Sequence, residues 1–162
     1  MTAQFLPTVL PGDPVPPARV AAAIRGDWYG DIDPAAFHVE MRVDEKAITP
    51  DRVRHALIAA MIRVEGDLDD WRIARTAEGA ASLAAVPSAQ IDGTSRLVYL
   101  YRRAVFTAAK ADLIEGYPDM DLTGRGERAA DQMAPSIADL RRNSLHAVRD
   151  MIGVGRTAID LI

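Results

Sequence analysis

The chain has 162 residues, of which 49% are hydrophobic, 26% charged and 6% aromatic, which predicts one globular domain with a helical bias. Its formal net charge of −4 at pH 7 argues against a protein that holds DNA through a dense basic face. The absence of cysteine excludes disulfides, iron–sulfur clusters, thiolate catalysis and cysteine-ligated zinc.

The apolar stretches of the chain are too short to span a membrane, which takes roughly 18 or more consecutive apolar residues. The best candidate, LVYLYRRAVFTAA, is interrupted by Arg102 and Arg103. The first residues also lack the basic-then-apolar pattern of a signal peptide. We therefore expect a soluble protein that is cytoplasmic when made and has no membrane partner.

Residues 1–30 differ in composition from the rest of the chain. The first 17 residues hold the prolines Pro7, Pro11, Pro14, Pro16 and Pro17. So many prolines prevent a helix or a central strand, so we expect an extended N-terminal arm. The run ARVAAAIRG fits a short helix that ends at Gly26. The arm is expected to be either a disordered tail or a segment that lies along a neighbouring subunit.

Two helix starts follow, each with a capping residue before a proline. Asp33 and Pro34 predict a short helix through roughly Arg42. Thr49 and Pro50 predict a long helix, PDRVRHALIAAMIRVEGDLDDWRIAR, in which Gly66 allows a bend. Its apolar positions recur every three or four residues, as expected for an amphipathic helix: Val53, Leu57, Ala60, Met61, Val64, Leu68 and Trp71.

The next segment, EGAASLAAVPSAQIDG, is loop-like, with one turn expected at residues 82–85. Asp92 or Thr94 can cap a third helix, TSRLVYLYRRAVFTAAKADLIEG, which Gly116 and Pro118 end. This helix is apolar over much of its circumference. We therefore expect it to be the central and most buried helix of the fold.

A fourth long helix is predicted after Thr123, reading GERAADQMAPSIADLRRNSLHAVRDMIG. Pro135 predicts a kink or a break within it, and Gly153 and Gly155 end it. Its inner stripe is expected to contain Met133, Ile137, Leu140, Ser144, Val148 and Met151. No strand ladder is evident. The sequence thus predicts an all-α bundle of about four main helices over residues 31–152, with a short tail at residues 153–162.

The stretch DMDLTGRGERAAD, from Asp119 to Asp131, resembles a calcium-binding loop at its start. Asp119, Asp121 and Thr123 occupy the first, third and fifth ligand positions of an EF-hand, and Gly124 its turn position. The bidentate glutamate needed at the twelfth position is replaced by Ala130. This departure argues against a calcium site.

The same stretch contains a second motif, G-x-G-x-x-A, formed by Gly124, Gly126 and Ala129. The dinucleotide fingerprint must follow a hydrophobic strand, and DMDLT is not one. We therefore interpret the stretch as a polar joint between two helices, with Thr123 and Glu127 supporting the next helix start.

No catalytic constellation emerges from the remaining polar residues. His38, His55 and His146 fall on three different predicted helices, and neither H-E-x-x-H nor G-x-S-x-G occurs. An acidic cluster beside Trp71 and two arginine pairs are expected to be solvated or ion-paired: Asp67, Asp69, Asp70, Arg102, Arg103, Arg141 and Arg142. We predict no catalytic, cofactor-binding or metal site and no cofactor, and an enzyme is the least favoured class.

The order of these motifs resembles phage head-completion proteins, the head–tail connector adaptors of temperate contractile-tailed phages. The resemblance runs from about Trp28 to Ile162, through WYGDIDPAAFHVEMRV, ITPDRVRHALIAAMIRVEGDLDDWR, LAAVPSAQIDGTSRLVYLYRRAVFTAAKADLIEGY and GERAADQMAPSIADLRRNSLHAVRDMIG. Its strength lies in the order and spacing of the motifs, above all in the VP…IDG step into the central helix. The proline-rich residues 1–17 fall outside it.

The resemblance implies a structural virion protein of the neck that meets its partners in the host cytoplasm during assembly. Such adaptors form a homo-oligomeric ring, a dodecamer, beneath the portal protein after DNA packaging. The ring extends the DNA channel, through which DNA passes without sequence-specific binding. It also offers a docking surface for a stopper or tail-side connector protein. A closed ring needs two different patches on each subunit, expected on the second and fourth long helices.

Two sets of contact residues follow from this interpretation. The tail at residues 153–162 is predicted to insert into a groove of the portal through Arg156, Ile159, Leu161 and Ile162. The channel is predicted to be lined by acidic side chains that repel DNA phosphates, with Asp119, Asp121, Asp131 and Asp139 as candidates. The main alternative is a stand-alone helical interaction module, a regulator or small chaperone, that works as a dimer.

Overall fold

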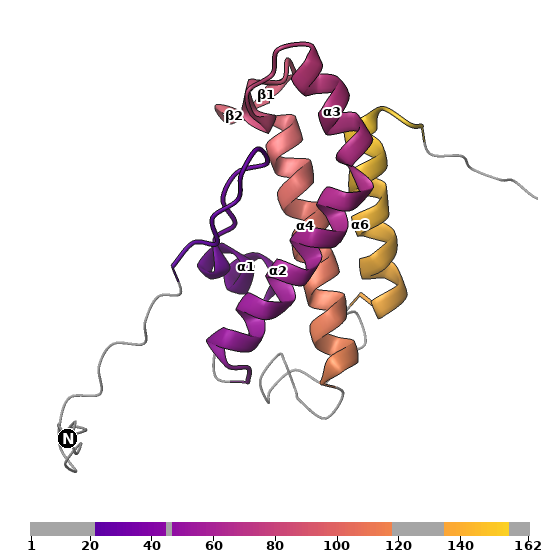
Figure 1. The fold of residues 1–162 in the computed structure, drawn as a ribbon. Coiled ribbons are helices and arrows are strands. Elements are labelled where there is room, and N and C mark those ends of the chain that lie inside the picture. Colours follow the sequence, from indigo (N-terminus) through magenta and orange to yellow (C-terminus); the bar gives the residue numbers. More distant parts are fainter. Residues whose placement is uncertain (1–21, 45–46, 118–134, 156–162) are drawn as a thin grey trace, which may run out of the picture.

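The computed structural model describes residues 22–44, 47–117 and 135–155 of the chain (Figure 1). Its elements in chain order are α1 (Pro34–Met41), α2 (Pro50–Asp67), α3 (Asp69–Ala77), the 3₁₀ turn η1 (Leu83–Ala85), β1 (Gln90–Ile91), β2 (Thr94–Ser95), α4 (Arg96–Gly116) and α6 (Ile137–Ile152). Helices dominate, and the sheet in these ranges is the small antiparallel β1–β2 pair. The predicted all-α bundle is confirmed.

The first two helix starts lie where the cap-and-proline signals predicted them. The side chain of Asp33 accepts a hydrogen bond of 2.9 Å from the backbone nitrogen of Ala35, which satisfies one free N–H group of α1. Thr49 precedes α2 but makes no side-chain capping bond. Pro50 still favours the start of α2, because its fixed φ angle suits the first helical position.

The predicted long second helix is two helices, α2 and α3, which are separated at Leu68. Leu68 is fully buried, and its N–H group is shared between the carbonyl oxygens of Val64 and Glu65 at 3.2 and 3.1 Å. This tightened turn ends α2. The apolar spacing could not reveal the break, because Leu68 continues the buried stripe of α2 while the backbone changes conformation.

Helix α4 is the central element, as predicted, and it packs against both α2 and α6 (Figure 1). Its buried residues lie on several sides of the helix and include Tyr101, Val105, Phe106 and Leu113. Its cap is Ser95, whose hydroxyl accepts from the backbone nitrogen of Leu97, and not Asp92 or Thr94 as predicted.

The expected cap residue Asp92 has a different role, in the turn of a small hairpin. Asp92 and Gly93 join β1 to β2 and have φ angles of 49° and 70°. Positive φ at both residues of a two-residue loop is the geometry that Asp-Gly favours in hairpins. Asp92 and Thr94, which were expected to cap α4, belong to the hairpin. The next residue, Ser95, therefore caps the helix.

Residues 24–32 form a loop that inserts two aromatic side chains into the bundle. Ile24 and Ile32 exchange backbone hydrogen bonds of 2.7 and 2.9 Å and close the loop. Trp28 and Tyr29 are buried, and Trp28 Nε1 donates to the carbonyl oxygen of Ala80 at 3.0 Å. Residues 22–26 contain no helix, so the expected short helix does not extend to Gly26.

Helix α6 begins two residues after Pro135, where the sequence predicted a kink or break. Ser136 caps it, because its hydroxyl oxygen accepts from the backbone nitrogen of Asp139. The Asp139 carboxylate in turn accepts from the backbone nitrogen of Ser136, and the two bonds form a capping box. The predicted helical segment that precedes Pro135 lies outside the described residues. Leu140, Val148 and Met151 of the predicted inner stripe are buried.

The remaining predicted stripe positions of α6 are less buried. Ile137 and Ser144 are half-buried, and the Ser144 hydroxyl donates to the carbonyl oxygen of Ala104 on α4 at 2.9 Å. Met133 lies outside the described residues. Gly153 ends the helix with a φ angle of 77°, a left-handed conformation that glycine adopts without strain.

Candidate assembly surfaces

Asp139 is the one predicted contact residue that falls within the described ranges. The remaining candidates lie outside them: Asp119, Asp121, Asp131, Arg156, Ile159, Leu161 and Ile162. Asp139 lies in the first turn of α6, where it accepts hydrogen bonds from the hydroxyl (2.8 Å) and the backbone nitrogen (3.2 Å) of Ser136. These bonds hold the pKa of Asp139 below its usual value, and Arg142 adds to the effect. The Asp139 carboxylate therefore stabilises the first turn of α6.

Helix α6 runs between the two ends of the bundle, and the segments that contain the other candidate residues begin at these ends. Its 16 residues correspond to about 24 Å along the axis. The end of α4 and the start of α6, between which residues 118–134 fall, lie near one end of the bundle, and the end of α6, which precedes the tail, lies at the other (Figure 1). The segment that contains Asp119, Asp121 and Asp131 therefore begins and ends at one end of the bundle. The candidate portal-binding tail begins at the other end.

The histidines of the described ranges do not converge on a site. His38 lies on α1, with Nδ1 3.0 Å from the carbonyl oxygen of Val43, His55 is exposed on α2, and His146 is half-buried on α6. Within residues 22–44, 47–117 and 135–155, no group of three histidine, aspartate or glutamate side chains could hold a metal ion. The EF-hand-like and dinucleotide-like motifs fall outside these ranges. None of the described helices has the length and apolar character needed to cross a bilayer.

Charged side chains make ion pairs between the long helices, and one of them, Arg141, was expected to be solvated or ion-paired. Arg63 on α2 contacts the Asp112 carboxylate on α4 at 2.9 Å, and Arg141 on α6 pairs with Glu115 on α4. Arg141 also lies 4.0 Å from Asp112. These pairs link all three long helices on one face of the bundle. Each is solvent-exposed enough to contribute only about 0–1 kcal/mol.

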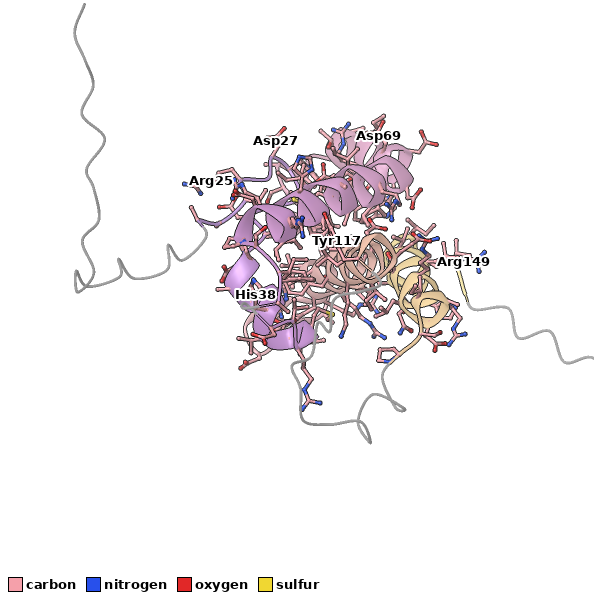
Figure 2. All side chains as sticks on the ribbon, turned by 90° about the horizontal axis from the view of Figure 1, so that it is seen from below. Arg25, Asp27, His38, Asp69, Tyr117 and Arg149 are labelled. Atoms are coloured by element: carbon pink, nitrogen blue, oxygen red, sulfur yellow. The ribbon has the colours of Figure 1, made fainter. Side chains whose placement is uncertain are left out.

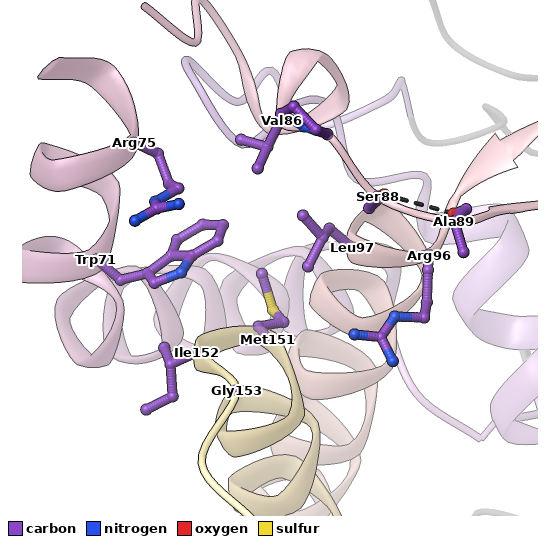
Figure 3. A pocket seen from close by; sticks show the side chains of 11 residues that line it. Trp71, Arg75, Val86, Ser88, Ala89, Arg96, Leu97, Met151, Ile152 and Gly153 are labelled. Carbon is purple, nitrogen blue, oxygen red and sulfur yellow. Dashed lines mark hydrogen bonds between the residues drawn. The ribbon is translucent and has the colours of Figure 1, made fainter. Parts of the chain in front are cut away.

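An open groove of about 480 Å³ lies where α3, the segment after η1 and the end of α6 meet (Figure 3). Its floor is apolar, with Leu97 and Met151 buried and Trp71 half-buried. Arg75 and Arg96 line it as well. The Nε atom of Arg75 is buried and has no hydrogen-bond partner in the described part of the chain. The groove therefore combines an apolar floor with positive charge.

The groove borders the point at which the tail leaves the bundle. Ile152 and Gly153 line it, and the next residue, Val154, is exposed. The backbone nitrogen of Val154 still bonds to the carbonyl oxygen of Arg149, at 3.0 Å. Apolar surface thus continues from the groove into the chain that precedes residues 156–162.

The exposed residues of α6 form one continuous stripe, defined here as the α6 stripe. It consists of Ala138, Arg141, Arg142, Leu145, Arg149 and Ile152, which recur every three or four positions. The stripe has three arginines and no acidic residue. Its two large apolar side chains are exposed, with Leu145 at 48%. Figure 2 shows Arg149 pointing away from the bundle.

A second exposed surface lies along α2 and α3, defined here as the α2–α3 stripe. It consists of Ile58, Ile62, Asp67, Asp69, Asp70 and Ile73. Ile62 is 69% exposed and Ile73 is 53% exposed. Asp69 pairs with Arg72 at 2.7 Å, whereas Asp67 and Asp70 make no ion pair with other described residues. The stripe is therefore apolar and acidic, opposite in charge to the α6 stripe.

The two stripes belong to different helices of the bundle. Helices α2 and α6 flank α4, and Asp69 and Arg149 point outward on different sides in Figure 2. The sequence predicts two patches on these helices but identifies neither Ile62 nor Leu145. Spacing places Ile62 and Leu145 outside the predicted buried stripes of their helices, but it does not show whether another part of the bundle covers them.

Comparison with known proteins gives a consistent result over most of the chain. Residues 15–162 match the family model described as phage head completion protein (GPL). The chain is similar to the head completion/stabilization protein of Escherichia phage P2, with 34% identity over 135 residues, which cover 83% of this chain and 79% of that protein. No solved structure matches the chain.

Proposed function

The chain belongs to the phage head completion protein family, and we propose that it acts there as a head–tail connector adaptor. Its role is structural: it is a virion component that completes or stabilises the phage head. The adaptor assembles into a closed ring, a dodecamer, beneath the portal once DNA is packaged. It extends the DNA channel and presents a surface to a stopper or tail-side connector in the neck. The family match, which spans most of the chain, carries this proposal.

The arrangement of the bundle supports a connector role. A ring in a neck must contact neighbours on two sides and partners at two ends. The described bundle has exposed apolar surface on α2–α3 and on α6, and chain segments attach at both of its ends. Exposed apolar patches on a soluble protein commonly mark protein interfaces. In a ring, the exposed apolar surfaces would contact neighbouring subunits, and the segments at the two ends would contact partner proteins.

The portal contact is proposed to lie in the tail, through Arg156, Ile159, Leu161 and Ile162. The groove beside Gly153 supports this placement, because its apolar floor and the exposed Val154 form a continuous surface at the base of the tail. The tail supplies three apolar anchors and one cation after two glycines. A short segment of this kind can bind a groove in a partner at the cost of ordering a few residues.

The tail is tested by deleting residues 156–162 and keeping Gly153 and Val154, because these two residues close the end of α6. A matched control replaces the same seven positions with glycine and serine. Both variants should retain the thermal unfolding curve of the full chain and lose binding to immobilised portal rings. Full portal binding by either variant would refute the tail assignment.

The channel lining is proposed to include Asp119, Asp121, Asp131 and Asp139, whose negative charges would keep DNA mobile. Asp139 also supports the start of α6, so its reversal would confound folding with channel charge. The test therefore reverses Asp119, Asp121 and Asp131 to lysine together and leaves Asp139 intact. We expect slower DNA ejection from assembled particles. An unchanged ejection rate would remove these residues from the channel.

The ring itself is tested by mixing the purified protein with portal rings and measuring the mass of the complex. A connector adaptor adds many copies per portal. The alternative, a stand-alone dimeric interaction module, keeps its own mass and leaves the portal mass unchanged.

A further inference from the structure

We propose that the α6 stripe of one subunit packs against the α2–α3 stripe of the next subunit, and that this contact repeats around the ring. The proposal rests on the proposed ring and specifies which surfaces build it. The partner is therefore a second copy of this chain, bound head to tail.

The apolar residues of both stripes lack a partner within the described bundle. Ile62 and Ile73 are 69% and 53% exposed, and Leu145 is 48% exposed. A single exposed apolar side chain is common, but Ile58, Ile62 and Ile73 are all exposed along α2 and α3, and Leu145 and Ile152 are both exposed on α6. Packing Leu145 against Ile62 or Ile73 of a neighbour would remove both contacting side chains from water.

The charges of the two stripes identify what covers each of them. Arg149, Asp67 and Asp70 make no ion pair with any other described residue. Arg141 and Arg142 already pair with Glu115 and Asp139, and Asp69 pairs with Arg72, so the unpaired charges are Arg149 on the α6 stripe and Asp67 and Asp70 on the α2–α3 stripe. Each stripe is thus complementary to the other, and each would repel a copy of itself.

This pattern selects a head-to-tail contact over a two-fold dimer. A two-fold contact places the same patch on both sides, so it would juxtapose arginines with arginines or aspartates with aspartates. A contact between different patches pairs opposite charges and can repeat around an axis. The stripes also lie on different helices that both pack against α4, and a repeating contact requires two different patches.

A nucleic acid is a weaker candidate for the α6 stripe. Leu145 and Ile152 lie among its arginines, and apolar side chains gain nothing from phosphate contact. The net charge of −4 also opposes DNA at long range.

The absence of native cysteine allows a direct test by cross-linking. One chain carries Leu145→Cys together with Ile62→Cys, and a second carries Leu145→Cys together with Ile73→Cys. All three positions are exposed, so the fold should tolerate the changes. Assemblies on the portal are treated with a short bismaleimide and separated on denaturing gels. At least one double variant should give a ladder of covalent multimers.

The control variants separate the possible geometries. Each single-cysteine variant should remain monomeric on the gel, because the same position never faces itself. Leu145→Cys with Val39→Cys should give no ladder, because Val39 lies on α1, outside both stripes, although it is 78% exposed. Dimers from a single-cysteine variant would indicate a two-fold contact and overturn the proposal.

The charge component has its own test. Arg149→Glu should lower the cross-linking yield at least several-fold, and adding Asp67→Lys and Asp70→Lys should restore part of it. Arg103→Glu, an equal charge change at an exposed site on α4, should leave the yield unchanged. If Arg149→Glu lowers only DNA retention and not cross-linking, the α6 stripe contacts nucleic acid and the proposal fails.

Failure of this inference can be told apart from failure of the ring. If rings form on the portal and no double variant gives a ladder, the ring stands and the stripes are not its interfaces. If no ring forms, the proposed function itself is wrong.

Discussion

The hydroxyl of Tyr101 on α4 donates a hydrogen bond of 2.6 Å to the Glu65 carboxylate on α2. Tyr101 is almost fully buried and stacks on Tyr29, with ring centroids 5.1 Å apart and planes inclined by 17°. Trp28 meets Tyr29 edge-on at 5.1 Å and Trp71 edge-on at 5.9 Å. This aromatic cluster fastens the loop at residues 24–32 to α2, α3 and α4.

The bond between Tyr101 and Glu65 predicts a loss of stability in the Tyr101→Phe variant. Removing the hydroxyl leaves a half-buried carboxylate without its donor, so the free energy of unfolding should fall by about 2 kcal/mol. Urea denaturation at neutral pH measures the change.

The matched control is Tyr29→Phe in the same cluster. The Tyr29 hydroxyl is buried and has no hydrogen-bond partner in the described part of the chain. Its removal should therefore leave the unfolding free energy unchanged or raise it. A larger loss in the Tyr29 variant than in the Tyr101 variant would contradict this explanation of the cluster.

The same cluster predicts a loss of stability at alkaline pH. Burial raises the pKa of Tyr29 to about 12, although the positive charge of Arg72 acts in the opposite direction, and burial together with the bond to Glu65 raises the pKa of Tyr101. A pKa that is higher in the folded state favours the protonated form there. The contribution of Tyr29 is thus complete below about pH 10, its unfolded pKa, and is lost as the pH rises toward 12.

Urea denaturation between pH 9 and 12, in roughly half-unit steps, measures this effect. The unfolding free energy of the wild-type protein should fall more steeply with pH than that of Tyr29→Phe. Parallel curves for the two proteins would show that Tyr29 titrates at its ordinary value.

Two glycines should respond to alanine in opposite directions. A Cβ atom on Gly26 would lie 2.0 Å from the carbonyl oxygen of Gly30, so the loop that carries Trp28 and Tyr29 would have to open. Gly26→Ala should lower the unfolding free energy by at least about 2 kcal/mol. A Cβ atom on Gly66, within α2, would point into open space, and alanine there should add roughly 0.5–1 kcal/mol.

Thermal denaturation of the two glycine variants gives the comparison directly. The melting temperature should fall for Gly26→Ala and rise for Gly66→Ala. An unchanged melting temperature for Gly26→Ala would mean that the loop at residues 24–32 does not support the bundle.

The sequence predicted those parts of the fold that are encoded locally. Proline at the first helical position marked the starts of α1 and α2, and Pro135 lies two residues before α6. The central position of α4 followed from its apolar composition. These signals act over four or five residues, so no knowledge of packing is needed to interpret them.

The features that the sequence did not predict depend on contacts between distant residues. The break at Leu68 depends on packing in the whole bundle. The same holds for the hydrogen bond from Trp28 to Ala80, which lies 52 positions away in the sequence. The hairpin at Asp92 and Gly93 had a local signal, but its strands of two residues are too short to produce an alternating pattern. The exposure of Ile62 and Leu145 likewise depends on which other elements pack against their helices.

Closure of a ring on the portal can be observed by electron microscopy of the purified protein mixed with portal rings. We expect a second ring of symmetric density that is coaxial with the portal and continues its channel. Portal particles without added density, beside a monomer or dimer of this protein, would contradict the connector role.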